Sequence, residues 1–185
     1  MKTPFTFFSG GRAALWFALL WIFGATAVFA TADLRPFDAK SLAEIRQAHA
    51  GRPFVLAFWS IHCAPCKEEM SLLSEFKRRY PQVSIVLVAT DPPSEKPTVI
   101  RYLAGQKPGP LETWSFADEF AERVRFAVDR KWRGELPRTY FYNAEHQPTA
   151  QTGSLDPAWV ESWMKQETAP KPKSDPKSGH APVAG

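Results

Sequence analysis

Residues that bind metal ions are scarce in this sequence, which holds two cysteines and four histidines among its 185 residues. A structural zinc site needs about four ligands, usually two cysteine pairs or two cysteines with two histidines. The histidines are spread along the chain, at His49, His62, His146 and His180. The sequence therefore argues against a zinc module. A copper site of two cysteines and one histidine stays open, because His62 directly precedes Cys63.

A stripe of basic side chains is also missing. The formal net charge is +4, and acidic residues are interleaved with Lys and Arg nearly everywhere. Proteins that bind nucleic acid gather basic residues on one face or along one helix instead. We therefore expect no nucleic-acid partner and interpret the charge as that of a solvated surface.

Acidic residues are absent from the first 32 positions, which also carry the longest apolar run. Lys2 and Arg12 are followed by an uncharged run of about 18 residues, 13–30, and small residues, Ala30 and Ala32, precede the first acid. This pattern predicts a signal peptide over 1–32, cleaved after Ala32, with an uncleaved anchor through residues 13–30 as the alternative. Both place the remainder outside the cytoplasm, in the periplasm or an equivalent space, because the basic end stays inside.

The other end lacks apolar residues. Residues 168–185 are rich in Pro, Lys, Ser, Gly and Ala, with Val183 as the one branched apolar side chain. Such a segment buries too little surface to offset its ordering entropy, so we predict a disordered tail. One domain, residues 33–167, is left between the two ends.

Within this domain the apolar pattern predicts alternating strands and helices. Strands are expected at 54–59, 84–89, 111–116, 139–142 and 149–153. Helices are expected at 41–49, 63–80, 97–106, 118–128 and 156–164. The first two strands are apolar throughout and flank a helix, so we predict a parallel βαβ unit. The last two strands suggest an antiparallel hairpin, which gives a mixed α/β sheet flanked by helices.

Two helix starts carry capping residues. Ser41 and Glu44 have the spacing of a capping box for the first helix. Asp156 precedes Pro157, as expected for an N-cap followed by proline in the first turn of the last helix.

The two cysteines lie two residues apart, where the strand 54–59 gives way to a helix. A purely structural disulfide between them would close too small a loop to add much stability. As a redox pair it is well placed. Cys63 would face the unpaired N–H groups and the positive end of the helix dipole, which stabilise a thiolate, and Cys66 follows one turn later. We therefore favour a redox pair.

The segment from Phe58 to Met70, with Trp59 and Ser60 ahead of Cys-Ala-Pro-Cys, resembles the active site of thioredoxin-fold proteins. It is most similar to the extracytoplasmic TlpA/ResA-like thiol-disulfide oxidoreductases. The segment from Glu135 to Phe141 matches their cis-proline segment, and the insert between Ala89 and Ser115, with its own helix, resembles theirs. The resemblance covers about residues 34–167.

The resemblance implies a role for each residue. Cys63 would attack a client disulfide, and the more buried Cys66 would resolve the mixed disulfide. Pro137 would be cis and pack over the pair, and the backbone of Leu136 would bind an extended substrate. Trp59 would pack beside the site and, with Leu136 and Pro137, contact the substrate. The partners implied are client proteins with thiols or disulfides and a membrane electron donor, with no cofactor.

The chain departs from the family pattern at three positions. Ala57 replaces a buried acid, Ser71 replaces a proline, and His62 stands where a Trp commonly precedes the first cysteine. We predict that a protonated His62 lowers the pKa of the Cys63 thiol and makes the disulfide more oxidising. Glu69 either replaces the missing acid in serving Cys66 or is an ordinary residue on the helix surface.

The direction of electron flow follows from the resemblance as well. The Ala-Pro pair between the cysteines is closer to the Gly-Pro of reducing thioredoxins than to the Pro-His of a strong oxidant, so we expect a reductant. The alternative is a copper-binding chaperone of the same fold, using Cys63, Cys66 and a histidine such as His146.

Overall fold

A computed structural model of the chain describes residues 34–106, 109 and 111–170. The predicted signal peptide or anchor, and residues 171–185 of the predicted tail, lie outside these residues. Among the described residues, no helix is long and apolar enough to cross a membrane.

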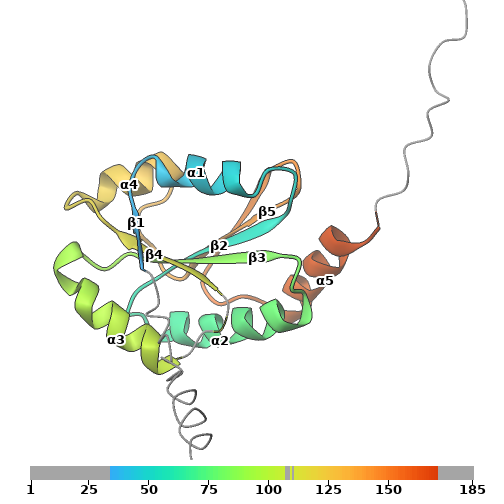
Figure 1. Ribbon diagram of the computed structural model, residues 1–185, viewed down its shortest axis with the longest axis horizontal. Helices are drawn as coiled ribbons and strands as arrows, with labels where there is room; N and C mark the ends of the chain where they lie inside the picture. The colour runs from blue at the N-terminus through green and yellow to red at the C-terminus, as the bar shows by residue number, and fades with distance from the viewer. Residues whose placement is uncertain (1–33, 107–108, 110, 171–185) are drawn as a thin grey trace, which may run out of the picture. The chain divides into compact units, whose positions relative to one another are not determined.

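A six-stranded mixed sheet forms the centre of the domain, in the order β1-β4-β3-β2-β5-β6 (Figure 1). Its strands are β1 (Arg35–Phe37), β2 (Phe54–Trp59), β3 (Ser84–Ala89), β4 (Glu112–Phe116), β5 (Arg138–Tyr142) and β6 (Pro148–Thr152). The pairs β1–β4, β4–β3 and β3–β2 are parallel, and β2–β5 and β5–β6 are antiparallel. The predicted parallel βαβ unit and the predicted hairpin are both confirmed.

Helices cover both faces of the sheet (Figure 1). They are α1 (Ser41–Ala48), α2 (Ala64–Arg79), α3 (Lys96–Gln106), α4 (Ala121–Val128) and α5 (Pro157–Thr168), with a 3₁₀ turn, η1 (Pro93–Glu95), before α3. α1 and α4 pack on one face, and α2, α3 and α5 on the other. The insert after β3 therefore does contain a helix, as predicted, and α5 extends through Thr168, the first residue of the predicted tail.

The position of the core follows from the alternation of side chains along β2. Val55, Ala57 and Trp59 point into the core beneath α2, α3 and α5, while Phe54 and Phe58 point into the core beneath α1 and α4. Because successive strand residues face opposite sides, a strand covered on both faces must be apolar at every position. The cysteine pair lies shortly after β2, a strand in which every residue is buried.

Two elements of the structure differ clearly from the sequence predictions. The three-residue strand β1 was not predicted, because only Phe37 in it is buried. α4 begins at Ala121 instead of position 118, because Asp118 accepts a hydrogen bond from the Phe120 N–H in a turn before the helix.

The predicted capping box of Ser41 and Glu44 is wrong. The Asp38 carboxylate accepts hydrogen bonds from the N–H groups of Lys40 and Ser41, so the capping acid lies three residues earlier. At α5 the capping prediction is confirmed, since the Asp156 carboxylate accepts a hydrogen bond from the Ala158 N–H.

Candidate active site

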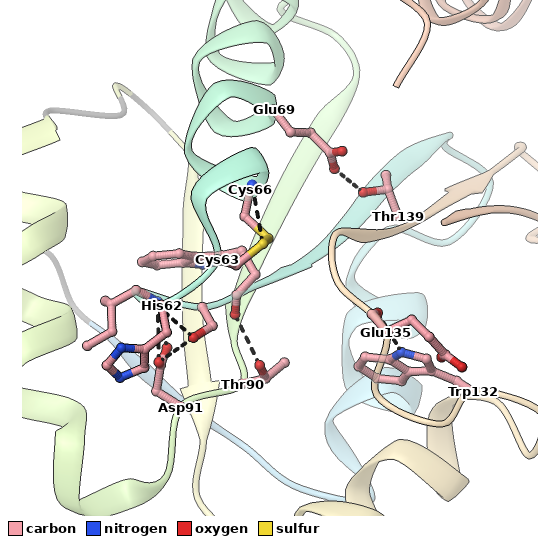
Figure 2. Close-up of a disulfide and its surroundings, with 12 residues drawn as sticks. His62, Cys63, Cys66, Glu69, Thr90, Asp91, Trp132, Glu135 and Thr139 are labelled. Atoms are coloured by element: carbon pink, nitrogen blue, oxygen red, sulfur yellow. Dashed lines mark hydrogen bonds between the residues drawn. A yellow bond between two sulfur atoms is a disulfide. The ribbon is translucent and has the colours of Figure 1, made fainter. Parts of the chain in front are cut away.

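Cys63 and Cys66 form a disulfide at the junction of β2 and α2 (Figure 2), with their Cα atoms 5.3 Å apart. Cys63 is half-buried, whereas Cys66 is only 1% exposed. A partner sulfur can therefore approach Cys63, while Cys66 is shielded behind it. This difference in burial is the one that the predicted roles of attacking and resolving cysteine require.

The position of Cys63 at the start of a helix sets its electrostatics. It is the N-cap of the 16-residue α2, and its Sγ accepts a hydrogen bond from the Cys66 N–H at 3.3 Å. Pro65 lies in the first turn, where a missing N–H costs nothing. In the reduced protein, the same N–H group and the positive end of the helix dipole would stabilise a thiolate on Cys63.

The loop that precedes β5 lies next to Cys66. The Leu136–Pro137 peptide bond is cis, as predicted, and Pro137 is buried and lines a small cavity that it shares with Cys66. The Trp132 indole N–H donates to the Glu135 carbonyl at 3.0 Å, which ties the loop down (Figure 2). The substrate contact predicted for Leu136 stays a prediction.

Trp59 lies beside the disulfide, as predicted, and lines the same cavity. Its side chain is only 3% exposed and packs against Tyr102, with the ring centroids 5.4 Å apart. Trp59 therefore supports the site from within the core, and its contact with a substrate stays a prediction.

Glu69 is not a surface residue, so the simpler of its two interpretations is wrong. Its side chain is 6% exposed, lines the cavity beside Cys66, and accepts a hydrogen bond from the Thr139 hydroxyl (Figure 2). The second carboxylate oxygen is buried without a hydrogen-bond partner among the described residues. Burial raises the pKa of Glu69 from 4.5 to about 7, against the opposing effect of the Thr139 hydrogen bond.

The pairing of β2 with β5 explains how the Glu69 carboxylate can reach this position from α2. Ala57 pairs with Thr139 across β2 and β5, and both lie next to the space into which Glu69 projects. An acid at position 57 would compete for this space. With alanine there, the Glu69 side chain from α2 can occupy it.

Comparison with known proteins shows what this arrangement resembles. No protein-family model and no curated protein matches the chain in sequence. Among solved structures, a secreted disulfide oxidoreductase of Mycobacterium tuberculosis, homologous to DsbE of E. coli, superposes with a TM-score of 0.52 at 20% identity, over 65% of this chain and 85% of that one. A thiol:disulfide interchange protein of the thioredoxin family from Chlorobium tepidum superposes with a TM-score of 0.55 at 17% identity, over 66% and 83%.

The chain has the thioredoxin fold. The exposed lipoprotein thioredoxin Etrx1 of Streptococcus pneumoniae is similar as well, with a TM-score of 0.54 at 12% identity, over 65% of this chain and 88% of that one. At these identities the likeness establishes the fold. The cysteine pair at the start of α2 and the cis-proline before β5 are observed in this chain's own geometry.

His62 lies where the thioredoxin fold places the residue before the first cysteine, but its ring turns away from the sulfur atoms (Figure 2). Its side chain is 71% exposed, and its Nε2 lies 2.8 Å from a carboxylate oxygen of Glu95 on η1. The predicted effect of His62 on Cys63 therefore has to act in the presence of a neighbouring negative charge, which opposes it.

His146 does not join the cysteines. Its ring packs against Phe54, with the centroids 5.2 Å apart, and its Nε2 lies 3.0 Å from the His49 carbonyl oxygen. Phe54 begins β2 and the cysteines follow its end, about 16 Å away at the rise of an extended strand. The copper site with Cys63, Cys66 and His146 therefore does not form in this fold.

Sequence reasoning missed two residues that shape the site. Thr139 holds Glu69, and Asp91 accepts hydrogen bonds from the Ser60 hydroxyl at 2.7 Å and from the Ile61 N–H at 3.2 Å. One signal could have revealed Asp91. It follows β3 just as Ser60 follows β2, and the carboxyl ends of adjacent parallel strands meet at one edge of a sheet.

Proposed function

We propose that the protein is an extracytoplasmic thiol-disulfide oxidoreductase that exchanges disulfides with client proteins, in the main as a reductant. The observation that carries the proposal is the pairing of a half-buried Cys63, at the start of a 16-residue helix, with a buried Cys66. Helix-terminal cysteines of this kind have lowered thiol pKa values and react as thiolates.

The exchange would run in two steps. The Cys63 thiolate attacks one sulfur of the client disulfide, which forms a mixed disulfide and releases the other client sulfur as a thiolate. Cys66 then loses its proton and attacks the Cys63 sulfur, which releases the second client sulfur and forms the Cys63–Cys66 disulfide. The client gains two electrons and the enzyme loses two. A dithiol donor at the membrane would return them.

Glu69 is the group best placed to accept the proton of the Cys66 thiol. It lines the same cavity, its free oxygen has no other partner among the described residues, and its pKa of about 7 lets it exchange a proton near neutral pH. In this reading Glu69 accepts the Cys66 proton as that thiol attacks, and Thr139 orients the carboxylate.

Support for the compartment and the direction comes from the sequence and from the neighbours. The basic and apolar N-terminus is that of an exported or membrane-anchored chain. The M. tuberculosis protein of the same fold is secreted, and the S. pneumoniae protein is an exposed lipoprotein. Selective reduction in an oxidising space requires an electron supply, which is why we include a membrane donor.

A matched pair of variants tests the proposal. Cys66→Ala keeps the attacking sulfur and removes the resolving one, so it should accumulate mixed disulfides with insulin and with extracytoplasmic proteins. Cys63→Ala should form none, because its remaining thiol is buried. Equal trapping by the two variants, or trapping by neither, would overturn the assignment.

The direction of electron flow is tested by the reduction potential. We expect the reduction potential of Cys63–Cys66 to lie near that of thioredoxin, about −270 mV, and far from the roughly −120 mV of the oxidant DsbA. A potential close to the second value would show an oxidant instead.

A further inference from the structure

Three potential metal ligands meet beside the disulfide, and none of them takes part in the two proposed exchange steps. His62 lies in the loop after β2, Asp91 in the loop after β3, and Glu95 in η1. One ring nitrogen of His62 and one oxygen of each carboxylate all lie within 4.8 Å of one another. The fold therefore brings together three ligand atoms from the two connections that follow β2 and β3.

Asp91 is the buried member of this cluster, and hydrogen bonds hold its carboxylate in place. It is 4% exposed, and its Oδ1 accepts hydrogen bonds from the Ser60 hydroxyl at 2.7 Å and from the Ile61 N–H at 3.2 Å. Among the described residues, its Oδ2 accepts only a longer hydrogen bond, at 3.3 Å, from the same N–H. Hydrogen bonds to one oxygen that hold a carboxylate in place are the usual outer-shell support of a metal ligand.

The other two ligands are adjustable. His62 is 71% exposed and Glu95 is partly exposed, so their side chains can shift by the small amount that coordination needs. Tetrahedral zinc, with bonds of about 2.0–2.2 Å, places its ligand atoms roughly 3.4 Å apart. The ligand atoms of the cluster lie 2.8 Å apart between His62 Nε2 and Glu95 and within 4.8 Å of one another overall, so small shifts of the side chains would bring them to this spacing.

The charge of the cluster also favours a cation. Two carboxylates converge on one imidazole, and within residues 34–106 and 111–170 no Lys or Arg side chain forms an ion pair with Asp91 or Glu95. A divalent ion would balance both carboxylates. The set of one histidine and two carboxylates leaves at least one coordination position open.

We propose that His62, Asp91 and Glu95 form a binding site for a divalent transition-metal ion, of which Zn²⁺ fits best. The site includes the residue directly before Cys63, so a bound ion would neutralise two carboxylates in the neighbourhood of the attacking cysteine. This proposal does not rest on the oxidoreductase activity, since the three ligands come together while the disulfide is closed.

Titration of the full-length oxidised protein with Zn²⁺ in a non-chelating buffer tests the proposal. The disulfide removes both sulfur atoms as ligands, so binding cannot arise from the cysteine pair. We expect one equivalent of Zn²⁺ by calorimetry. Co²⁺, used as a spectroscopic probe, should show d–d bands that Zn²⁺ displaces.

Variants locate the ion. His62→Ala and Glu95→Gln should each weaken Zn²⁺ binding at least tenfold, and Ser60→Ala should weaken it by about 10–100-fold through Asp91. His146→Ala and Asp118→Asn serve as matched controls, because they remove a histidine and a carboxylate elsewhere, and they should bind like the wild type. Circular dichroism checks that each variant is folded. Should His62→Ala unfold, the exposed-turn variant Glu95→Gln carries the test alone.

The proposal fails if the oxidised protein binds no Zn²⁺ at millimolar concentration. It also fails if binding survives in both His62→Ala and Glu95→Gln, since the ion would then lie elsewhere. Neither outcome would touch the mixed-disulfide experiment, so the two proposals fail separately.

Discussion

Replacing Glu69 by glutamine should make the oxidised protein more stable at alkaline pH and leave it unchanged at acid pH. Glutamine keeps the size and can accept the hydrogen bond from Thr139, but it has no charge to bury. Burial raises the pKa of Glu69 from 4.5 to about 7, so the folded state holds this proton more tightly than the unfolded state does.

The sign and size of the effect follow from this difference. Below pH 4.5 the carboxyl is protonated in both states and has no effect on the free energy of unfolding. Between pH 4.5 and about 7 only the unfolded state ionises, so the stability of the wild type falls as pH rises. Above pH 7 both states are ionised, and the loss levels off at about 3 kcal/mol, to order of magnitude.

Urea unfolding of the oxidised wild type and Glu69→Gln, at several pH values from 4.5 to 8.5, measures this directly. The two curves should converge near pH 4.5 and separate by about 3 kcal/mol above pH 8. Glu68→Gln is the matched control, because Glu68 is exposed on the same turn, and it should follow the wild type. Parallel curves for Glu69→Gln and the wild type would refute the buried, protonated carboxyl.

The same variants separate stability from chemistry. If Glu69 accepts the Cys66 proton, Glu69→Gln should slow the release of client from the mixed disulfide near pH 7–8, and Glu68→Gln should not. Unchanged release rates in Glu69→Gln would remove the proton-transfer role while leaving the stability argument intact.

Two further predictions concern the loop that carries the cis-proline. Asp129 accepts hydrogen bonds from Arg138 at 2.9 Å and from the Tyr140 hydroxyl at 3.1 Å, so Asp129→Asn should lower the free energy of unfolding by about 1–3 kcal/mol, and an unchanged urea midpoint would contradict this. Trp132→Phe removes the N–H that holds the Glu135 carbonyl. It should cost about 0.5–1.5 kcal/mol and speed amide hydrogen exchange in this loop, and exchange at the wild-type rate would count against the bond.

The elements that could be predicted from the sequence are those marked by a pattern of adjacent residues. β2 is apolar at every position and β3 at every position after Ser84, and Cys63 and Cys66 lie where β2 meets a helix. Both the strands and the site could therefore be predicted from adjacent residues. The cis-proline before β5 was reached through the resemblance of its segment, which is also short and continuous.

The environment of Glu69 could not be predicted in this way, because it depends on the pairing of β2 with β5. Only that register brings Thr139 opposite Ala57 and leaves a space that a side chain from α2 can enter. Spacing along α2 by itself does not separate a buried glutamate from an exposed one. The cluster of His62, Asp91 and Glu95 was missed for the same reason, since it joins the connections after β2 and β3, which are about 30 residues apart in the sequence.

The error at Ser41 shows a limit of local motifs. A Ser with a Glu three residues later has the capping spacing, but Asp38 was already placed to accept from the free N–H groups of the first turn. A carboxylate accepts such bonds more strongly than a hydroxyl does, so the acid takes the position.

The central claim is that the start of α2 holds the Cys63 sulfur as a thiolate. The pH dependence of iodoacetamide alkylation in reduced Cys66→Ala measures it directly, because only the thiolate reacts. The account predicts a midpoint at least about one pH unit below the value of roughly 8.5 for free cysteine. A midpoint at 8.5 would contradict it.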